Sequence, residues 1–257
     1  MGTWIWTVCG KHPTVNDYFI TCDSNPLAGG FSDWVVRGYD AIVSRRRSSV
    51  AAFPPLSWRF WAAGPGRETL LCGIIRDSND TIGRPYPLLV LGVGPLGDWQ
   101  SHWHCVPFAC EKTWSHMESV AARPHRDLKH LDDEIQRIRP PQPDWPSFQR
   151  IHQDLSDQAR SQEGTGWPAD FKELAGKHLA ASEDEGDRIF IPISEKPPFD
   201  FLSIIQLWHS ALKTHFTELP KAVFMGGAPH RTFLAVFSQP LSLADFVRLW
   251  SICPEGE

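Results

Sequence analysis

The sequence predicts an α/β fold in which a mixed β-sheet is flanked by helices as a layered sandwich, and not a classical Rossmann fold. The first observation is the order of the expected elements, which runs β, α, three β, α, linker, β, α, two β, α. The second is that neighbouring strands are joined by turns in some places and by helices in others, which a strictly alternating fold does not show. The third is that 257 residues, 42% of them hydrophobic, suffice for a core without disulfides.

The first hundred residues carry clear strand and helix patterns. Residues 3–8 are bulky or β-branched throughout and stand before Gly10, which predicts a strand that enters a loop. Between Phe31 and Val43 apolar residues recur at three- and four-residue spacing, and Ser32 is placed to cap, so an amphipathic helix is expected. Three runs with strand-like composition follow, at residues 57–62, 69–76 and 88–93. We expect these three strands to pair in one sheet.

Beyond residue 108 the apolar spacing changes to that of a helix. Apolar residues recur on one face from Phe108 to Ile138, and Pro124 should break or kink this helix. A proline-rich connector and a polar, partly acidic stretch come next, and they are the least constrained part of the chain. The remaining expected elements are a strand at 188–193, a helix at 201–216, strands at 222–225 and 232–237, and a helix at 242–250.

These patterns divide the chain into three parts. Residues 1–138 form an N-terminal α/β region, and residues 139–187 form the proline-rich connector with the polar, partly flexible segment. Residues 188–257 form a C-terminal β-α-β-β-α portion. We expect this last portion to pack on the same core as the first.

Charge and composition restrict the partners and the compartment. The chain has 25 Lys and Arg against 30 Asp and Glu, and no basic stretch is interleaved with aromatic residues, which argues against nucleic acid as a partner. Six scattered cysteines indicate reduced thiols, so a cytoplasmic protein is expected. No secretory signal is recognised at the N-terminus, and the longest apolar run, Pro87 to Leu96, is far shorter than the ~20 residues of a membrane span.

A glycine-rich stretch from Gly92 to Gly97 has the GxGxxG spelling of a dinucleotide-binding turn and follows an expected strand. Pro95, however, removes one backbone N–H from the loop that would hold a pyrophosphate, and no helix is expected to begin at Gly97. We therefore predict no dinucleotide cofactor.

A second stretch gathers side chains that can bind zinc. Its donors are His102, His104, Cys105, Cys110 and His116. Their spacing matches no paired arrangement that holds ligands in a tetrahedron, so scattered core and surface residues explain them better. No nucleophile elbow is present either, and the sequence predicts a protein without catalytic residues, cofactor or metal. The alternative function is a metal-dependent hydrolase that uses the His102–His116 segment.

The chain has twelve tryptophans, and their positions suggest two uses. Most lie in expected strands and helices and should be core residues. Four lie in irregular segments, and exposed tryptophans commonly anchor protein interfaces, so these four are candidate contact residues of which one or two should be exposed. They are Trp99, Trp103, Trp145 and Trp167.

Three short motifs carry the most specific information. They are CGKHPTVNDY at residues 9–18, SWRFW at 57–61, and DTIGRPYPL at 80–88. In order and separation these resemble the TagF (ImpM) family of type VI secretion accessory proteins, with its GK-x-P-x-x-x-D-aromatic loop, WRF strand and D-x-x-GR-x-aromatic-PL segment. The likeness is good over about residues 4–97. The closing stretch, Val223 to Trp250, is similar to the family's last strands and helix, but less specifically.

Charged residues of these motifs form a polar skeleton of Lys11, Asp17, Arg59, Asp80 and Arg84. Two readings are open for the loop residues. Either a carboxylate pairs with a buried arginine as a structural clasp, which we favour, or the same charges face a groove and recognise a partner. Arg59 lies within an apolar strand and is expected to be structural. The candidate residues, partner-binding or structural, are Lys11, Pro13, Asp17, Tyr18, Asp80, Gly83, Arg84, Trp99 and Trp103.

The resemblance implies a regulatory role. Proteins of this family are cytoplasmic accessories of the type VI secretion machine, and they resemble post-translational repressors that act through a forkhead-associated-domain scaffold. A non-enzymatic regulator with a protein partner is therefore the first hypothesis. The metal-dependent hydrolase is the second, and a structural subunit of the apparatus is the third. The sequence leaves the oligomeric state open.

Overall fold

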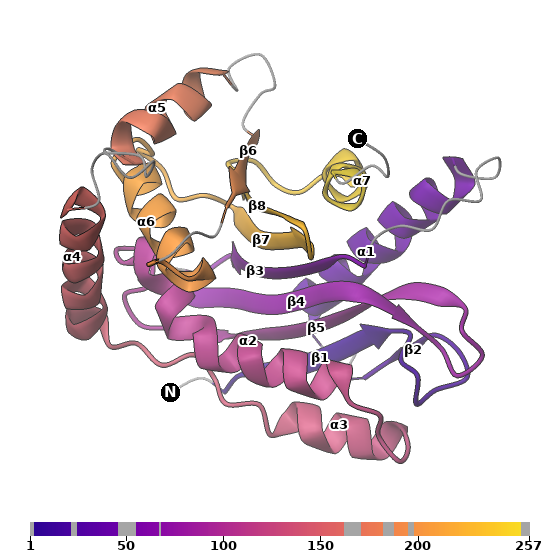
Figure 1. Ribbon diagram of the computed structural model, residues 1–257. Coiled ribbons are helices and arrows are strands. Elements are labelled where there is room, and N and C mark those ends of the chain that lie inside the picture. The colour runs from indigo at the N-terminus through magenta and orange to yellow at the C-terminus, as the bar shows by residue number, and fades with distance from the viewer. Residues whose placement is uncertain are drawn as a thin grey trace.

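One β-sheet contains strands from both the N-terminal and the C-terminal parts of the chain (Figure 1). The computed structural model describes residues 3–21, 25–45, 55–66, 68–161, 171–181, 188–194 and 198–252. The eight described strands are β1 (Ile5–Gly10), β2 (Phe19–Ile20), β3 (Ser57–Ala63), β4 (Thr69–Asn79), β5 (Pro85–Pro95), β6 (Arg188–Ile193), β7 (Ala222–Ala228) and β8 (Arg231–Phe237). Their order across the sheet is β2-β1-β5-β4-β3-β7-β8-β6.

Every pair of neighbouring strands in this sheet is antiparallel. Within the sheet, the two parts of the chain are joined by the pairing of β3 with β7, in a register that runs from Ser57 opposite Gly227 to Ala62 opposite Ala222. The predicted class, a helix-flanked sheet that is not a Rossmann fold, is confirmed. The expected mixture of parallel and antiparallel strands is not found, because all seven pairs of the described sheet are antiparallel.

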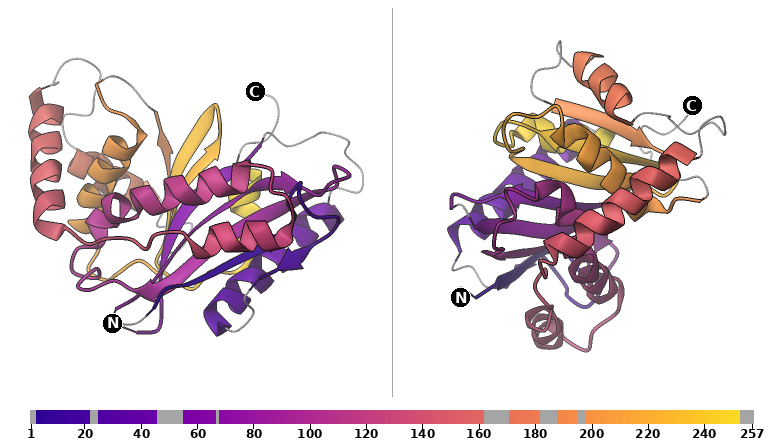
Figure 2. Two further views of the ribbon diagram at one scale, coloured as in Figure 1. Left: turned by 90° about the horizontal axis from the view of Figure 1, so that it is seen from below. Right: turned by 90° about the vertical axis from the view of Figure 1, so that its left-hand side faces the viewer.

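Helices cover both faces of the sheet. They are α1 (Pro26–Arg45), α2 (Val106–Ala122), α3 (Leu128–Gln136), α4 (Trp145–Ser161), α5 (Phe171–Ala181), α6 (Phe201–Lys213) and α7 (Leu243–Ser251), with a 3₁₀ turn η1 (Trp103–Cys105) before α2. Figure 2 shows α1 on the opposite side of the sheet from α2 and α3. In β3, Trp58 and Phe60 point toward the core layer of α1 and α7, whereas Trp61 points toward the layer of α2 and α6. This alternation explains why nearly every position of β3 is apolar.

Most predicted elements agree with the structure. All of the predicted strands are present, and the helix expected from Phe108 to Ile138 is divided into α2 and α3 by a segment that contains Pro124. The first helix begins at Pro26, earlier than its apolar pattern indicated. The two-residue strand β2 was not predicted, because two residues are too few to show an alternation.

The middle of the chain differs from the expectation. Residues 154–187 were expected to be the least constrained, yet the structure places the end of α4 and the whole of α5 within them. The reason is a narrow apolar face on α4, where Trp145, Phe148, Leu155 and Ala159 pack against the core. The rest of α4 is polar, so composition averaged over the segment concealed the helix. Residues 162–170 and 182–187 lie outside the described part.

No helix among the described residues combines the length and the apolar character that crossing a bilayer requires.

Candidate functional site

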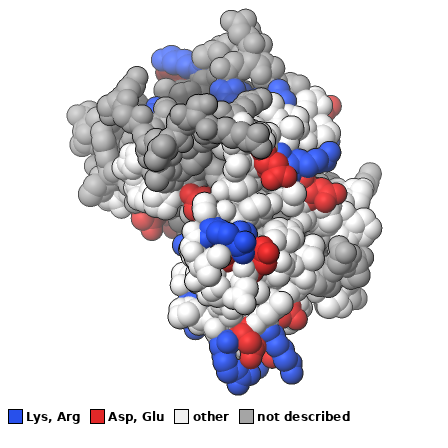
Figure 3. All heavy atoms as spheres, turned by 90° about the vertical axis from the view of Figure 1, so that its right-hand side faces the viewer, with Lys and Arg blue, Asp and Glu red and all other residues white. Residues whose placement is uncertain are grey.

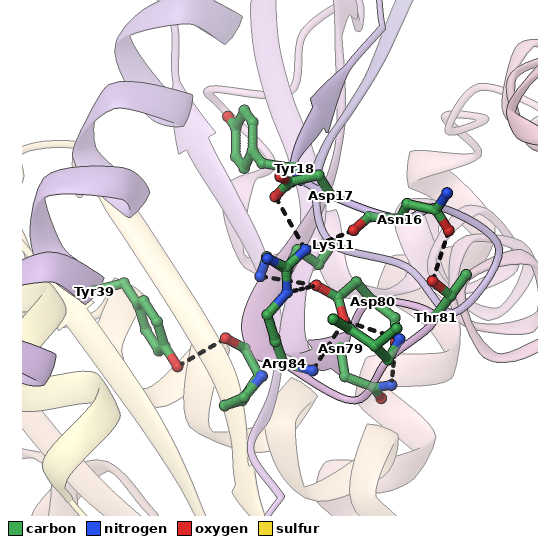
Figure 4. A network of polar contacts seen from close by, with 11 residues as sticks. Lys11, Asn16, Asp17, Tyr18, Tyr39, Asn79, Asp80, Thr81 and Arg84 are labelled. Atoms are coloured by element: carbon green, nitrogen blue, oxygen red, sulfur yellow. Dashed lines mark hydrogen bonds and ion pairs between the residues drawn. The ribbon is translucent and has the colours of Figure 1, made fainter.

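Two loops meet at one end of the sheet, and they contain the motif residues that the sequence singled out (Figure 4). One loop, residues 11–18, follows β1, and the other, residues 80–84, joins β4 to β5. They are neighbours because β1 pairs with β5. Gly10 allows the chain to leave β1 at this point, since its φ is +123° and a Cβ there would lie 2.0 Å from the carbonyl oxygen of Pro87.

Asp80 is the centre of the contact between the two loops. Its side chain is fully buried, with 0% of its area exposed. One carboxylate oxygen accepts hydrogen bonds from the backbone N–H groups of Ile82 (3.1 Å) and Arg84 (2.9 Å). The other accepts from Nε of Arg84 (2.6 Å) and Nζ of Lys11 (3.0 Å). We call Lys11, Asp80 and Arg84 the clasp, because one carboxylate holds a cation from each loop.

The clasp keeps Asp80 ionised. Burial alone would raise the pKa of this carboxyl, but the hydrogen bond from the Arg84 backbone and those from the Lys11 and Arg84 side chains outweigh it. The net effect holds the pKa of Asp80 well below its ordinary value. Removal of one partner of this buried carboxylate would leave an unmatched charge, so these contacts stabilise the arrangement of the two loops.

Arg84 also contacts the first loop directly. Its Nη2 donates to the carbonyl oxygen of Asn16 (2.6 Å) and lies 3.6 Å from the carboxylate of Asp17. Asp17 is 73% exposed and Arg84 is 49% exposed, so water screens this second ion pair and it contributes little to stability. Of the two loop carboxylates in the polar skeleton, Asp80 therefore makes the buried contact with Arg84, and Asp17 lies at the rim. The buried partner of this pair is the carboxylate, whereas the arginine that was expected to be buried is half exposed.

Tyr18 connects the first loop to α1. Its hydroxyl lies 3.1 Å from Oγ of Ser32, and its ring contacts the edge of Tyr86, which in turn contacts Tyr39 of α1. Gly83 has a φ of +83°, which a glycine adopts without strain at this turn. Pro13 is exposed. These residues fix the shape of the loops.

The tip of the second loop presents an apolar side chain to solvent. Ile82 is 73% exposed, the highest value among the large hydrophobic residues that the structure describes as exposed. Its backbone N–H is held by Asp80, so the side chain projects from an ordered turn. On the side of the molecule that carries this turn, acidic and basic side chains lie beside one another and do not gather into a patch of one sign (Figure 3). The arrangement is suited to contact with a protein.

Trp99 and Trp103 do not belong to this surface. Their position in irregular segments predicts contact residues, and this prediction is wrong. Trp99 is 0% exposed and Trp103 is 4% exposed. Both pack against Trp61, with ring centroids 5.7 Å and 5.9 Å away. The turn and the 3₁₀ helix between β5 and α2 fold over the sheet, so irregular backbone here carries core residues. Trp145 is also buried, at 9% exposed, and Trp167 lies outside the described residues.

Arg59 holds α2 against the sheet. Its guanidinium donates through Nε and Nη2 to both carboxylate oxygens of Glu118 (2.7 Å and 2.9 Å), and through Nη1 to Glu111 (2.7 Å). The two glutamates are seven residues apart on α2 and therefore lie on one face, two turns from one another. This arginine lies within a strand, as predicted, and its contacts are with a helix rather than with the clasp.

The five residues of the possible zinc segment are not brought together. His102 stacks on Trp145, with centroids 5.2 Å apart, whereas Nδ1 of His104 lies 3.0 Å from Nζ of Lys213. Burial raises the pKa of Cys105 to about 11 and also raises that of Cys110, which favours protonated thiols over the thiolates that bind metals. In the part of the chain that the structure describes, no group of three or more His, Cys, Asp or Glu residues could hold a metal ion.

Sequence reasoning missed two residues of the loop contact. Asn16 provides the carbonyl oxygen for Arg84 and its side chain accepts from the hydroxyl of Thr81 (2.8 Å). A backbone acceptor leaves no trace in the residue type, so only the turn-forming character of asparagine could have indicated Asn16. Ile82 was missed because a single apolar residue in a polar turn forms no pattern.

Comparisons with known proteins agree with these motifs. A family model described as the TagF N-terminal domain, type VI secretion system-associated, matches residues 7–138, which include both loops. The crystal structure of PA0076 from Pseudomonas aeruginosa PAO1 is similar over 98% of this chain and 96% of that one, with a TM-score of 0.54 and 14% sequence identity. At that identity the likeness shows a common fold. A search of curated proteins gave no match.

Proposed function

The chain belongs to the TagF family of type VI secretion system-associated proteins, and on that premise we propose that it is a cytoplasmic, post-translational repressor that binds a forkhead-associated-domain scaffold of the secretion system. The family makes it an accessory protein of this system. Three points are proposed: the scaffold as partner, the repression and the cytoplasmic location. They rest on the family resemblance together with the loop surface.

The observation that supports binding is an exposed apolar side chain on an ordered turn. Most exposed loops lose conformational freedom on binding, which opposes association. Here Asp80 already holds the backbone N–H groups of Ile82 and Arg84, so the turn is ordered before the partner arrives. Ile82 can then act as a central contact, with the half-exposed Arg84 and the exposed Asp17 as a charged rim.

We expect an interface of transient size, at or below the ~1,600 Å² of a standard complex. A regulator must leave its partner when repression ends, and small interfaces release more readily than obligate ones. Mutations at the centre should weaken binding strongly, whereas charge changes at the rim should mainly alter the association rate and its dependence on salt.

Ile82→Asp is predicted to weaken binding to the purified scaffold at least about tenfold, because a charge would be buried at the centre of the contact. The melting temperature should change little, since Ile82 is 73% exposed. Titration calorimetry measures the affinity, and a secretion assay in a strain that carries the variant should show loss of repression. Ile151→Asp is the matched control, because Ile151 is 43% exposed on α4, outside the clasp loops.

Two results would count against this proposal in different ways. Equal affinity of the wild type and Ile82→Asp for the scaffold would show that the loop surface is not the interface, while the scaffold would still be the partner. Failure of the wild-type protein to retain the scaffold from a lysate that contains the secretion cluster, where a positive control succeeds, would remove the partner itself. Retention of the scaffold without stoichiometric sheath or tube subunits would support a regulator over a structural subunit.

A further inference from the structure

Helices α4, α5 and α6 lie together at one end of the molecule (Figure 1). Residues of these three helices line a pocket of about 670 Å³. It is separate from the clasp loops and from the residues to which the proposed function is assigned. Its apolar wall includes Ala159, Phe171 and Leu207, one from each of these helices. Its polar wall includes His104, His152 and Lys213. Both the volume and the mixture of apolar surface with a few polar groups are typical of small-molecule sites.

Lys213 supplies a positive charge that no carboxylate of the described residues neutralises. Its Nζ donates to the carbonyl oxygen of Ser101 and to Nδ1 of His104, and both acceptors are uncharged. An ammonium group has three N–H donors, so these two contacts leave one donor and the whole charge. Burial lowers the pKa of Lys213.

His104 adds a second donor beside this cation. Burial, together with the charge of Lys213 and the neighbouring His152, lowers the pKa of His104 to about 3, so the imidazole is neutral at physiological pH. Its Nδ1 accepts from Lys213, and therefore Nε2 carries the proton and can donate. A cation and a neutral N–H donor thus stand together in the pocket wall, an arrangement that suits an oxygen anion.

Two hydroxyl groups stand on the neighbouring helices. Oγ of Ser210 lies 3.2 Å from Nδ1 of His152, and Oγ of Ser156 lies 3.4 Å from Nε2 of the same ring. Both serines line the pocket. A hydroxyl can rotate to donate to a ligand while its oxygen still serves its neighbour, so each serine can add a hydrogen bond to the oxygens of an anion.

We propose that this pocket binds a small organic oxyanion, a carboxylate or phosphate group carried on an apolar body, with Lys213 and His104 at the anionic group and Phe171 and Leu207 at the apolar part. The charge of Lys213 favours an anion, and three neutral donors, Nε2 of His104 and the hydroxyls of Ser156 and Ser210, favour oxygen as the atom that carries the negative charge. The apolar wall favours an organic body over inorganic phosphate. Such a ligand would make the protein responsive to a metabolite through a site distant in sequence from the clasp loops.

The test uses the full chain with phenyl phosphate, benzoate and benzyl alcohol, titrated by calorimetry at constant ionic strength. We expect at least one of the two anions to bind saturably with a Kd of about 1 mM or tighter, and benzyl alcohol to bind at least about tenfold more weakly. Preference for phenyl phosphate would identify a phosphate ligand, and preference for benzoate a carboxylate. Lys213→Met should lower the affinity for the preferred anion at least about tenfold. Lys112→Met, on the exposed face of α2, should leave this affinity unchanged.

A measurement on the wild-type protein keeps the test decisive if Lys213→Met does not fold. Amide NMR shifts at Ser156 and Ser210 should follow the same binding curve as the calorimetry. The proposal is overturned if neither anion saturates by about 10 mM, if benzyl alcohol binds equally well, if Lys213→Met keeps wild-type affinity, or if the shifts lie elsewhere in the protein.

Discussion

Asp80→Asn is expected to lower the melting temperature by about 5 to 10 °C at pH 7. The substitution keeps the size of the side chain but removes the negative charge that faces Lys11 and Arg84 at 3.0 Å and 2.6 Å. Lys11 is only 12% exposed, so its charge would lose its partner without gaining full hydration. An amide also offers one acceptor oxygen in place of two, so some of the four donors that now meet Asp80 would lose their acceptor.

Differential scanning calorimetry measures this change, and Asp17→Asn is its control. Asp17 also faces Arg84, but at 3.6 Å and with 73% of its side chain exposed, so its removal should shift the melting temperature by no more than about 2 °C. The two variants lose the same charge, and they differ in the burial, the distance and the hydrogen bonds of the contact that is lost. Equal shifts for both would show that net charge, and not the clasp, determines the effect.

The contribution of Asp80 should also depend on pH in the acid range. Its folded-state pKa is lowered, because the backbone of Arg84 and the side chains of Lys11 and Arg84 stabilise the carboxylate more than burial opposes it. The unfolded-state pKa is about 3.9. The stabilisation is therefore fully present above about pH 4 and is lost as the pH falls toward the folded-state value. The difference in melting temperature between wild type and Asp80→Asn should accordingly shrink below about pH 4, and a difference constant from pH 7 to pH 3 would contradict the clasp.

The sequence could predict which charged residues of the site pair better than it could predict which of them are buried and which are exposed. Arg84 lies four residues after Asp80 with Gly83 between them, a local pattern that already indicates a turn closed by an ion pair. Lys11 is distant in sequence from Asp80, and although the motifs placed both residues in one polar skeleton, nothing in the sequence paired them. Neither argument could show that Asp80 is completely buried while Asp17 is exposed, since this depends on how the two loops pack.

Periodicity predicted the strands and most helices because both faces of the sheet are covered, which makes each strand a dense apolar run. It failed for α4, where the apolar face is narrow. It also failed for Trp99 and Trp103, since an irregular segment has no period from which burial can be inferred. The pocket between α4, α5 and α6 could not be predicted either. Lys213, His104 and His152 come from three separate elements that only the fold brings together.

Trp99→Ala is expected to lower the free energy of unfolding by about 3 to 5 kcal/mol, the range for a fully buried tryptophan. Its side chain is 0% exposed and meets Trp61 edge to face at 5.7 Å. Removing the indole would leave a cavity against Trp61, which the rigid sheet cannot fill. Urea denaturation of the full chain measures the change, and Ile151→Ala, at a residue 43% exposed, should alter stability by no more than about 0.5 kcal/mol.

Trp99→Phe separates the volume of the indole from its polar atom. No described residue accepts a hydrogen bond from the indole N–H of Trp99, so phenylalanine loses apolar contacts but no hydrogen bond. The Phe variant should therefore recover most of the stability that alanine loses. If Trp99 were instead an anchor for the partner, the Ala variant would unfold at the wild-type urea concentration and bind the scaffold poorly. Because Trp99 is buried, we expect instead that the stability of the Ala variant falls and that any loss of binding is a consequence of unfolding.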